Sequence, residues 1–413
     1  MMERIIFHID VNSAYLSWES AHMLQHGYEL DLRTVPSAVG GDESKRHGIV
    51  LAKSIPAKKF GVQTGESLFS ARKKCPQLLV VPPHYELYVK ASDAMIKIIE
   101  QYSPAIQRFS IDEVFADMSH AKKDYMRYAK LISKRIEREL GFTVNIGISE
   151  NKLLAKMASD FEKPNKIHTL FKSELEEKFW PLDIGKLYMV GRKTKKKLVS
   201  RGINTIKDLA NSDPKYIRSW LKKPGLTIWE YANGIENSKV DPFGEVVKSV
   251  SNSTTTSFDV DNFEEAKKVL LAISEKVGMR LREIKMAGQV ISVGIKNFEF
   301  MRKTHQRKLF TPTNNTNKIY EKSVKLFREM WNGEKIRQFS IRVSELFPEN
   351  CCQLSFFDDF NEKALRLDKA IDDLRAEYGG LAISRATFLH SGISPIIGGV
   401  LLEEKYPMMK SEL

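Results

Sequence analysis

Two acidic residues stand side by side inside the apolar run FSIDEVFADM, which covers residues 109–118. Its β-branched and aromatic residues predict a strand that is at least half buried. A buried carboxylate costs several kcal/mol unless a partner neutralises it. Asp112 and Glu113 therefore demand neutralising partners, and this demand restricts what the chain can fold into. Arg108 could supply one salt bridge, which would leave one charge without a partner.

A third acid, Asp10, ends the apolar run of RIIFHIDVNSAYLSWE, and the polar residues after it predict a turn and a helix start. If this strand neighbours the expected strand 106–118, three carboxylates meet and repel one another unless cations lie between them. Mg2+ prefers such oxygen ligands, and two ions about 3.5–4 Å apart can serve phosphoryl transfer. Adjacent strand residues point to opposite faces, so Asp112 and Glu113 can share this site only near a bend, a bulge or a hairpin end.

Length and composition limit the class of protein. A chain of 413 residues is too long for one core and predicts roughly two to four domains. It has no apolar run of about 18 residues and no signal-peptide start, so we expect a cytoplasmic protein without membrane contact. Cys75 and the adjacent Cys351 and Cys352 offer neither a disulfide framework nor zinc spacing.

Positive charge is concentrated in the middle of the chain. The formal net charge of +13 divides into +2 for residues 1–165, +8 for 166–240, +7 for 241–345 and −4 for 346–413. An acid-bearing region followed by two basic blocks is typical of a phosphate-handling centre with polyanion-binding flanks. A basic surface that is merely solvated is the alternative that charge alone leaves open.

Strand-like and helix-like runs alternate through residues 1–165 and indicate an α+β fold. The pattern is compatible with a ferredoxin-like βαββαβ core and a mixed or antiparallel sheet. An insertion between Asn12 and Pro76 carries a helix and the basic loop IPAKKFGVQTGE. After the core, NKLLAKMASDFEKPN predicts a helix whose apolar residues face inward, while Lys152 and Lys156 share the opposite stripe.

Two further patterns follow. Residues 166–240 are helical and basic, and they read as helix, glycine turn at Gly191, helix, turn at Gly202 and helix, which resembles a helix-hairpin-helix element. Its backbone N–H groups could bind a phosphate without reading bases, although a generic helical hairpin has the same pattern. A second βαββαβ pattern starts at SVSNSTTTSFDV, and the open face of its sheet is expected to carry Lys296, Arg302, Lys308 and Arg342.

The motifs IDVNSAY, AKKFGV, SIDEVF and GISENKLLAKMASDFEKPN, with the glycine-turn helices, occur in the order and spacing of the Y-family translesion DNA polymerases. Over residues 1–345 the chain resembles the bacterial DNA polymerase IV type. The resemblance implies a multidomain right-hand polymerase of the α+β class. The implied domains are a palm of residues 1–12 and 77–165, fingers of 13–76, a helical thumb of 166–240, a βαββαβ little finger of 245–346 and a C-terminal tail of 347–413.

The same resemblance implies a chemistry and the residues that perform it. The reaction would be template-directed addition of dNTPs to a primer, with low fidelity, opposite damaged template bases. Two Mg2+ ions would be the cofactors, and the three acids would be both catalytic and metal-binding. The implied metal site consists of Asp10, Val11, Asp112 and Glu113. The implied DNA contacts are Gly191, Lys193, Lys195, Lys296 and Arg342.

Three residues are implied to bind the nucleotide, and two positions depart from the family pattern. Tyr15 matches the aromatic steric gate that leaves no room for a ribose 2′-OH, although a core tyrosine on an amphipathic helix gives the same pattern. Lys163 matches a phosphate-binding lysine. Lys58 stands where the family often has an arginine. A lysine presents a single point charge, whereas an arginine can form two parallel hydrogen bonds to a phosphate. Ile55 stands where many members have a tyrosine that hydrogen-bonds the phosphates.

The acidic tail contains QLSFF, which resembles the bacterial sliding-clamp-binding pentapeptide: Gln353, Leu354, Ser355, Phe356 and Phe357. The expected partners are therefore this clamp, primer-template DNA and a dNTP, and we expect the chain to be a monomer. The two phenylalanines could instead pack on the little finger. Beyond them, an apolar stripe over residues 360–378 predicts a helix that docks on the polymerase or on a partner.

Two rival functions share parts of this pattern. A catalytically silent family member could serve as a DNA-damage scaffold, but the presence of all three acids argues against it. A nucleotidyl cyclase shares a palm-like core and a carboxylate pair, but it would not need two basic blocks that hold DNA. Dependence of the reaction on a template separates a polymerase from a cyclase.

Overall fold

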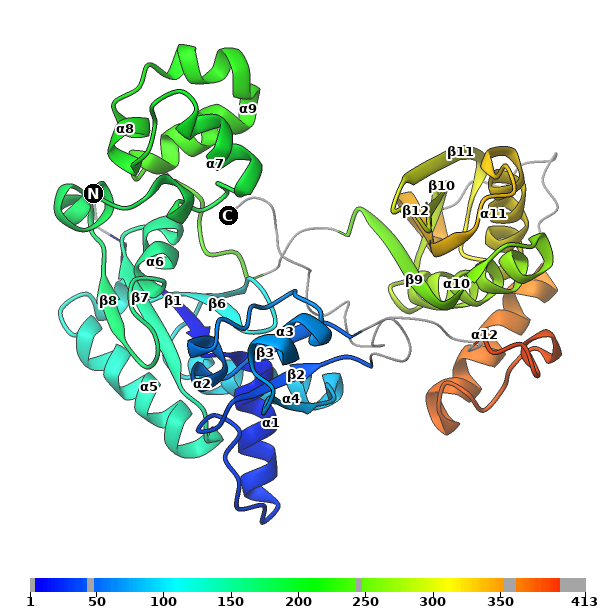
Figure 1. Ribbon diagram of the computed structural model, residues 1–413, viewed down its shortest axis with the longest axis horizontal. Coiled ribbons are helices and arrows are strands. Elements are labelled where there is room, and N and C mark those ends of the chain that lie inside the picture. The colour runs from blue at the N-terminus through cyan, green and yellow to red at the C-terminus, as the bar shows by residue number, and fades with distance from the viewer. Residues whose placement is uncertain (1–3, 43–47, 243–246, 352–361, 394–413) are drawn as a thin grey trace. The chain divides into compact units, whose positions relative to one another are not determined.

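The computed structural model describes residues 4–42, 48–242, 247–351 and 362–393. They form two compact units, one built mainly from Met1–Gly41 and Ile49–Gly244 and the other mainly from Glu245–Leu401. We call these the first and the second unit (Figure 1). Helices and strands mix in both, which confirms the predicted α+β class. In the part of the chain that the structure describes, no helix has the length and apolar character needed to span a membrane.

The first unit is organised around a five-stranded sheet. The strands lie in the order β5 (Ile106–Arg108), β6 (Glu113–Asp117), β1 (Ile6–Val11), β7 (Val144–Ser149) and β8 (Ile167–Thr169). All neighbours are antiparallel except β7 and β8. With helices α4 (Tyr85–Glu100) and α5 (Tyr125–Leu140), strands β1, β5, β6 and β7 form the predicted ferredoxin-like βαββαβ core.

The two faces of this sheet are covered differently. Phe7, Ile9 and Val11 on β1 are buried in one core with residues of α4 and α5. The alternate residues of β1 face helix α6 (Lys152–Ser159), which contacts β1 and β7. The approach is so close that a Cβ at Gly147 would lie 1.9 Å from the carbonyl oxygen of Ala155. Only glycine permits this approach, and α6 therefore lies directly over the side of the sheet that bears Asp10.

The acidic strand differs from the single strand that we predicted. It is a hairpin, in which β5 and β6 are joined by a bend at residues 110–112. Asp112 lies in that bend and Glu113 begins β6. The backbone N–H groups of Phe109 and Ser110 both donate to the Glu113 carbonyl, at 3.0 and 3.1 Å. The hairpin end meets the geometric condition under which two adjacent acids can share one site.

The insertion after β1 forms its own small layer. Strands β3 (Val50–Lys53), β2 (Ser37–Gly40) and β4 (Leu79–Val81) make a sheet in that order, accompanied by helices α1 (Ala14–Gln25), α2 (Ile55–Lys59) and α3 (Leu68–Lys74). The prediction of a loop at IPAKK was wrong, because these residues form α2. The Ser54 hydroxyl accepts a hydrogen bond from the N–H of Ala57 at 3.1 Å, and Pro56 fits the first turn of a helix.

The basic block of the first unit is helical, as predicted. It contains α7 (Arg192–Val199), α8 (Ile206–Ala210) and α9 (Pro214–Ala232), preceded by short turns of which the last is η5 (Ile184–Lys186). The helix predicted before Gly191 is only this single 3-10 turn, so the hairpin element consists of α7, the turn at Gly202 and α8. Gly202 has a φ of 79°, a conformation that glycine adopts without strain.

The second unit has the predicted βαββαβ sequence of elements. These are β9 (Ser249–Val260), α10 (Phe263–Glu283), β10 (Met286–Asn297), β11 (Arg302–Thr313), α11 (Thr316–Met330) and β12 (Ile336–Pro348). The strand order is β11-β10-β12-β9, which differs from the order in the first unit, and all pairs are antiparallel. Residues of α10 and α11 share one core with Ile291, Val293 and Ile295 of β10.

The predicted C-terminal helix is α12 (Glu362–Tyr378), and it docks on the second unit. Its charged face makes the contact. Asp372 forms a two-pronged ion pair with Arg282 at 2.5 and 3.0 Å, and Arg375 donates to Glu275 at 2.6 Å. Asp368 accepts from the first N–H of α11 at 3.0 Å. The predicted apolar stripe is instead turned outward at three positions: Leu367, Leu374 and Tyr378.

The buried Arg375–Glu275 pair makes a stability prediction. Arg375→Ala removes one partner and leaves Glu275 buried beside Arg385 alone, which is 2.6 Å away. Breaking a buried ion pair costs about 3–5 kcal/mol, so we expect a clear fall in the urea midpoint of the second unit. Lys369→Ala, at an exposed position of the same helix, is the matched control and should leave the midpoint unchanged. Equal midpoints for the two variants would contradict this role for the pair.

Candidate active site

A cavity of about 490 Å³ opens in the first unit where β1 ends. Its walls come from the start of α1, from β3 and α2, from the hairpin bend, and from the turn after α6. Several residues that were predicted from separate motifs line this one cavity: Asp10, Val11, Tyr15, Lys58, Asp112 and Lys163. Ile55, the position that departs from the family pattern, lines it as well.

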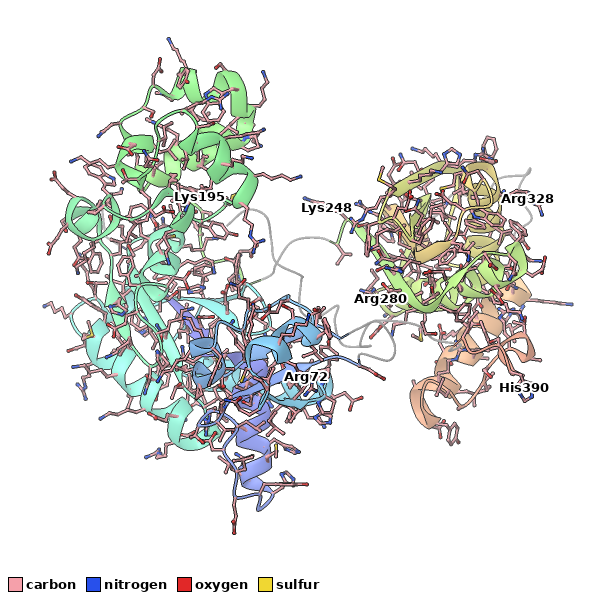
Figure 2. The ribbon with its side chains drawn as sticks, viewed as in Figure 1. Arg72, Lys195, Lys248, Arg280, Arg328 and His390 are labelled. Carbon is pink, nitrogen blue, oxygen red and sulfur yellow. The ribbon has the colours of Figure 1, made fainter. Side chains whose placement is uncertain are left out.

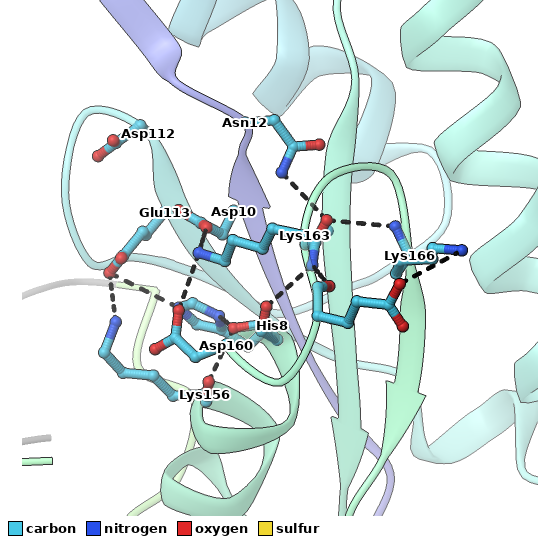
Figure 3. Close-up of polar contacts among 12 residues, drawn as sticks. His8, Asp10, Asn12, Asp112, Glu113, Lys156, Asp160, Lys163 and Lys166 are labelled. Atoms are coloured by element: carbon cyan, nitrogen blue, oxygen red, sulfur yellow. Dashed lines mark hydrogen bonds and ion pairs between the residues drawn. The ribbon is translucent and has the colours of Figure 1, made fainter. Parts of the chain in front are cut away.

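The sheet register brings the three acids to one place. Asp10 lies directly opposite Glu113 in the β1–β6 ladder. The backbone N–H of Val11 donates to the carbonyl oxygen of Asp112 at 3.0 Å, which ties the hairpin bend to the end of β1. Figure 3 shows the three carboxyl groups around the strand ends. Glu113 does not line the cavity, because its carboxylate is engaged beside α6.

Two lysines neutralise two of the three acids. Lys163 donates to the Asp10 carboxylate and lies 2.8 Å from Asp160. Lys156 donates to Glu113 at 2.7 Å (Figure 3). Lys152 and Lys156 were predicted on the stripe of α6 that faces away from the core, and this was wrong because they are 2% and 5% exposed and lie against the sheet. The Lys156 ammonium group tolerates that burial because it is paired with a carboxylate.

Other partners complete the surroundings of these acids. Asp112 accepts from the Ser110 hydroxyl at 2.6 Å. The buried His8 ring forms a 2.8 Å hydrogen bond with Ser159, and its Nε2 lies 3.7 Å from the Glu113 carboxylate, which is too far for a hydrogen bond. Arg108, the salt-bridge partner that the sequence offered, pairs with Asp93 at 2.7 Å. A simple salt bridge to Arg108 therefore does not explain the acidic pair.

The carboxyl groups have shifted pKa values that follow from these surroundings. Burial raises the pKa of Asp10 to about 7; Glu113 and Asp112 add to this rise, while Lys163 opposes it. Burial also raises the pKa of Asp112. For Glu113, burial acts upward, but the His8 ring and the Lys156 ammonium prevail and hold its pKa below the ordinary value. Burial, followed by the charge of Lys156, lowers the pKa of His8.

The site has the donor chemistry of a divalent cation site. Among the described residues, no three acid, histidine or cysteine side chains are arranged to hold one ion, because Asp10 and Glu113 are turned toward lysines. Asp10 and Asp112 nevertheless both line the cavity, and burial is the main cause that raises the pKa of each. Carboxylate and carbonyl oxygens are the ligands that Mg2+ and Ca2+ prefer. The residues thus fit a hard cation once the lysines turn aside.

Two residues at the cavity, Lys53 and Asn12, were not predicted from the sequence. Lys53, on β3, lines the cavity beside Lys58, and burial followed by the charge of Lys58 lowers its pKa. Its place in a strand that alternates inward and outward positions was the available signal. Asn12 donates to Asn145 at 3.0 Å and accepts from the N–H of Asn165 at 2.9 Å, so it fixes the turn that carries Lys163. No local pattern marks this role, because the partners are distant in sequence.

The remaining predicted site residues are not among those that line this cavity. Gly191, Lys193 and Lys195 are at the start of α7, where Lys195 pairs with Asp183 at 2.7 Å. Lys296 and Arg342 belong to the second unit, on β10 and β12. Basic side chains stand out from both units, among them Lys195 and Arg328 (Figure 2). Four predicted residues lie outside the described residues: Gln353, Leu354, Phe356 and Phe357.

The raised pKa of Asp10 predicts a pH-dependent change in stability. An acid whose pKa is higher in the folded state loses stability as the pH rises from its unfolded value, about 4, to its folded value, here about 7. Asp10→Asn cannot ionise and avoids that loss. With a chelator present, we expect the Tm of the variant minus that of the wild type to be more positive at pH 8 than at pH 5. Glu137→Gln, at an exposed position on α5, is the control; a pH-independent difference for Asp10→Asn would refute the assignment.

Comparisons with known proteins match nearly the whole length of the chain. A model of the impB/mucB/samB family matches residues 9–160, and a model of the family's C-terminal domain matches residues 247–356. DNA polymerase IV of Clostridium acetobutylicum is 44% identical over 391 residues, covering 94% of this chain and 99% of that protein. DNA polymerase IV 2 of Bacillus subtilis is 35% identical over 400 residues, covering 94% and 95%. A solved Y-family DNA polymerase chimera has the same fold, with a TM-score of 0.72 at 19% identity, covering 83% of this chain and 99% of that one.

Proposed function

The chain belongs to the impB/mucB/samB family, the Y-family DNA polymerases, and from that membership we propose how its own residues carry out DNA synthesis past damaged bases. It is a DNA-directed DNA polymerase of the DNA polymerase IV type. The observation that carries the proposal is the cavity in which Asp10, Asp112, Tyr15 and three lysines meet. Carboxylates can bind the cations that accompany a nucleoside triphosphate, and amines can bind its phosphates.

Enzymes of this family depend on divalent metal. We assign two Mg2+ ions to Asp10, Asp112, Glu113 and the backbone of Val11. When bound, the ions favour the deprotonated primer 3′-OH and neutralise charge on the triphosphate and the leaving pyrophosphate. The chain's share is to hold the carboxylates at the strand ends, where the β1–β6 register fixes their separation. The buried pairing of Glu113 with Lys156 keeps one acid ionised and oriented before the substrates arrive.

Amines on two sides of the cavity form the proposed triphosphate site. Lys163 is shared between Asp10 and Asp160, so it can turn from Asp10 to a phosphate while Asp160 retains it. Lys58 and Lys53 line the wall that α2 and β3 provide. Because Ile55 has no hydroxyl, the amines and the Ser54–Thr64 side of the wall supply the polar contacts there. Positioned charge of this kind stabilises the phosphoryl-transfer transition state.

DNA would be held by two basic surfaces. One is the start of α7, where backbone N–H groups and Lys193 can meet a phosphate. The other is the sheet face of the second unit that lies opposite the helices. Cross-strand pairs place Lys296 beside Arg302 and Arg342 beside Ser251 on this face. Small hydroxyl residues between basic side chains suit a sugar-phosphate backbone without base readout.

A two-variant comparison tests the assignment of the metal site. Asp112→Asn removes one cavity carboxylate without changing size, so primer extension with Mg2+, template and dNTPs should fall by at least about 1000-fold, as loss of a central transition-state contact does. DNA affinity should change little because the basic surfaces are intact. Asp117→Asn, at the far end of β6, should retain activity. Extension by Asp112→Asn at the wild-type rate would exclude this site, and extension without template would favour a cyclase-like enzyme.

We further propose that QLSFF binds the bacterial sliding clamp and that the polymerase acts as a monomer in the cytoplasm. Adjacent aromatic anchors suit a hydrophobic cleft on a partner. Tethering to the clamp raises the effective concentration of the enzyme at the primer end. The segment lies between β12 and α12, and both of these belong to the second unit.

Replacing Phe356 and Phe357 with Ala tests this tether. The double variant should extend primers as the wild type does when no clamp is present, because the cavity is untouched. It should lose the stimulation that a loaded clamp gives. Leu374→Ala and Tyr378→Ala, which remove exposed apolar side chains of α12, serve as the control for a general loss of surface hydrophobicity. Stimulation that persists in the phenylalanine variant would show that another segment binds the clamp.

A further inference from the structure

A buried carboxylate outside the metal site stands behind the cavity wall. Glu19, on α1, is 2% exposed and takes no part in the chemistry described above. Its carboxylate accepts a 2.5 Å hydrogen bond from the Tyr88 hydroxyl. It also accepts from the backbone N–H of His84 at 3.1 Å and lies 2.9 Å from the His84 ring. Glu19 therefore ties the start of α4 to α1 through one charged group.

Tyr88 also contacts Tyr15, which lines the cavity. Its ring is fully buried and stacks on the ring of Tyr15, with centroids 4.4 Å apart and planes 13° from parallel. Trp18 and Tyr85 close the same aromatic group around Tyr88, at 5.7 and 5.8 Å. Tyr15 is the member of the group that lines the cavity. One face of the Tyr15 ring is thus backed by Tyr88.

A steric gate works only if its ring cannot move aside. Tyr15 is the second residue of α1, at the edge of an open cavity, where a side chain usually keeps freedom of rotation. The stacked Tyr88 removes that freedom, and the short hydrogen bond to Glu19 keeps Tyr88 from sliding. Burial, reinforced by the hydrogen bond with Glu19, raises the pKa of Tyr88, so its hydroxyl keeps the proton that it donates.

We propose that Tyr88 and Glu19 are positioning residues for sugar selection, which hold the Tyr15 ring against the 2′ position of the incoming nucleotide. This inference rests on the proposed polymerase function and on Tyr15 as its gate. It assigns discrimination between ribonucleotides and deoxyribonucleotides to three residues in contact rather than to one. Neither Tyr88 nor Glu19 needs to touch the nucleotide for this role.

The test compares kcat/KM for dCTP and CTP in primer extension. Tyr15→Ala should lower the preference for dCTP by orders of magnitude. Tyr88→Leu removes the backing ring and should lower it by about tenfold or more, chiefly by raising incorporation of CTP. Tyr88→Phe and Glu19→Gln keep the packing and disturb only the hydrogen bond, so each should produce a smaller shift in the same direction. These two milder variants keep the test decisive if Tyr88→Leu does not fold.

A double-variant cycle separates positioning from general destabilisation. If Tyr88 acts through Tyr15, adding Tyr88→Leu to Tyr15→Ala should leave the preference unchanged, because the gate is already absent. Tyr125→Leu, which removes a partly buried ring of the same core that packs on Phe171, should leave the preference of the wild type intact.

The outcomes distinguish the two levels of the proposal. No extension by the wild type, or no effect of Tyr15→Ala, would refute the proposed function or its gate. A relaxed preference in Tyr15→Ala together with an unchanged one in Tyr88→Leu, Tyr88→Phe and Glu19→Gln would overturn this inference alone. Equal losses for dCTP and CTP in the Tyr88 variants would do the same, because they would show a merely structural role.

Discussion

The burial of three carboxylates at the ends of two neighbouring strands is the constraint on which the rest of the first unit depends. The register of β1 and β6 sets Asp10 against Glu113, and the hairpin bend adds Asp112. Like charges so close to one another need cations to offset their repulsion. Helix α6 and the turn after it supply positive charge, because they place Lys156 beside Glu113 and Lys163 beside Asp10. Because residue 147 is glycine, α6 can lie close enough to the sheet for these ion pairs to form.

In the proposed function, separate parts of the same cavity serve the reaction and the selection of the sugar. Acids and amines gather at the strand ends and on the α2 wall, where charge on a triphosphate would lie. Aromatic rings gather at the start of α1, where Tyr15 is backed by Tyr88. Electrostatic groups work by fixed orientation, and a gate works by excluded volume, yet both need a rigid second layer. A buried glutamate supplies it for the proposed gate, and the buried Lys156 supplies it for Glu113.

In the second unit, charged side chains lie on two separate surfaces with different roles. On the open sheet face, basic and hydroxyl side chains remain accessible for a polyanion. On the helical side, arginines and acids pair with one another and dock α12, while Leu367 and Leu374 face outward. An arginine with two carboxylate bonds fixes both distance and orientation, which an apolar contact does not. Charged pairs therefore place the helix that follows the QLSFF segment.

The sequence by itself determined the α+β class, the order of elements in the second unit and the acids that must share a site, because periodicity and buried charge are local signals. It did not determine that α6 turns its lysines inward, that IPAKK is a helix, or that α12 docks by its charged face. Those outcomes depend on partners far along the chain: Glu113 for Lys156, and Glu275 for Arg375. The link from Glu19 through Tyr88 to Tyr15 joins residues up to 73 positions apart, and only the packing of α1 against α4 creates it. A local pattern cannot tell a stabilising partner from a solvated one, so tertiary structure decided how each buried group is paired.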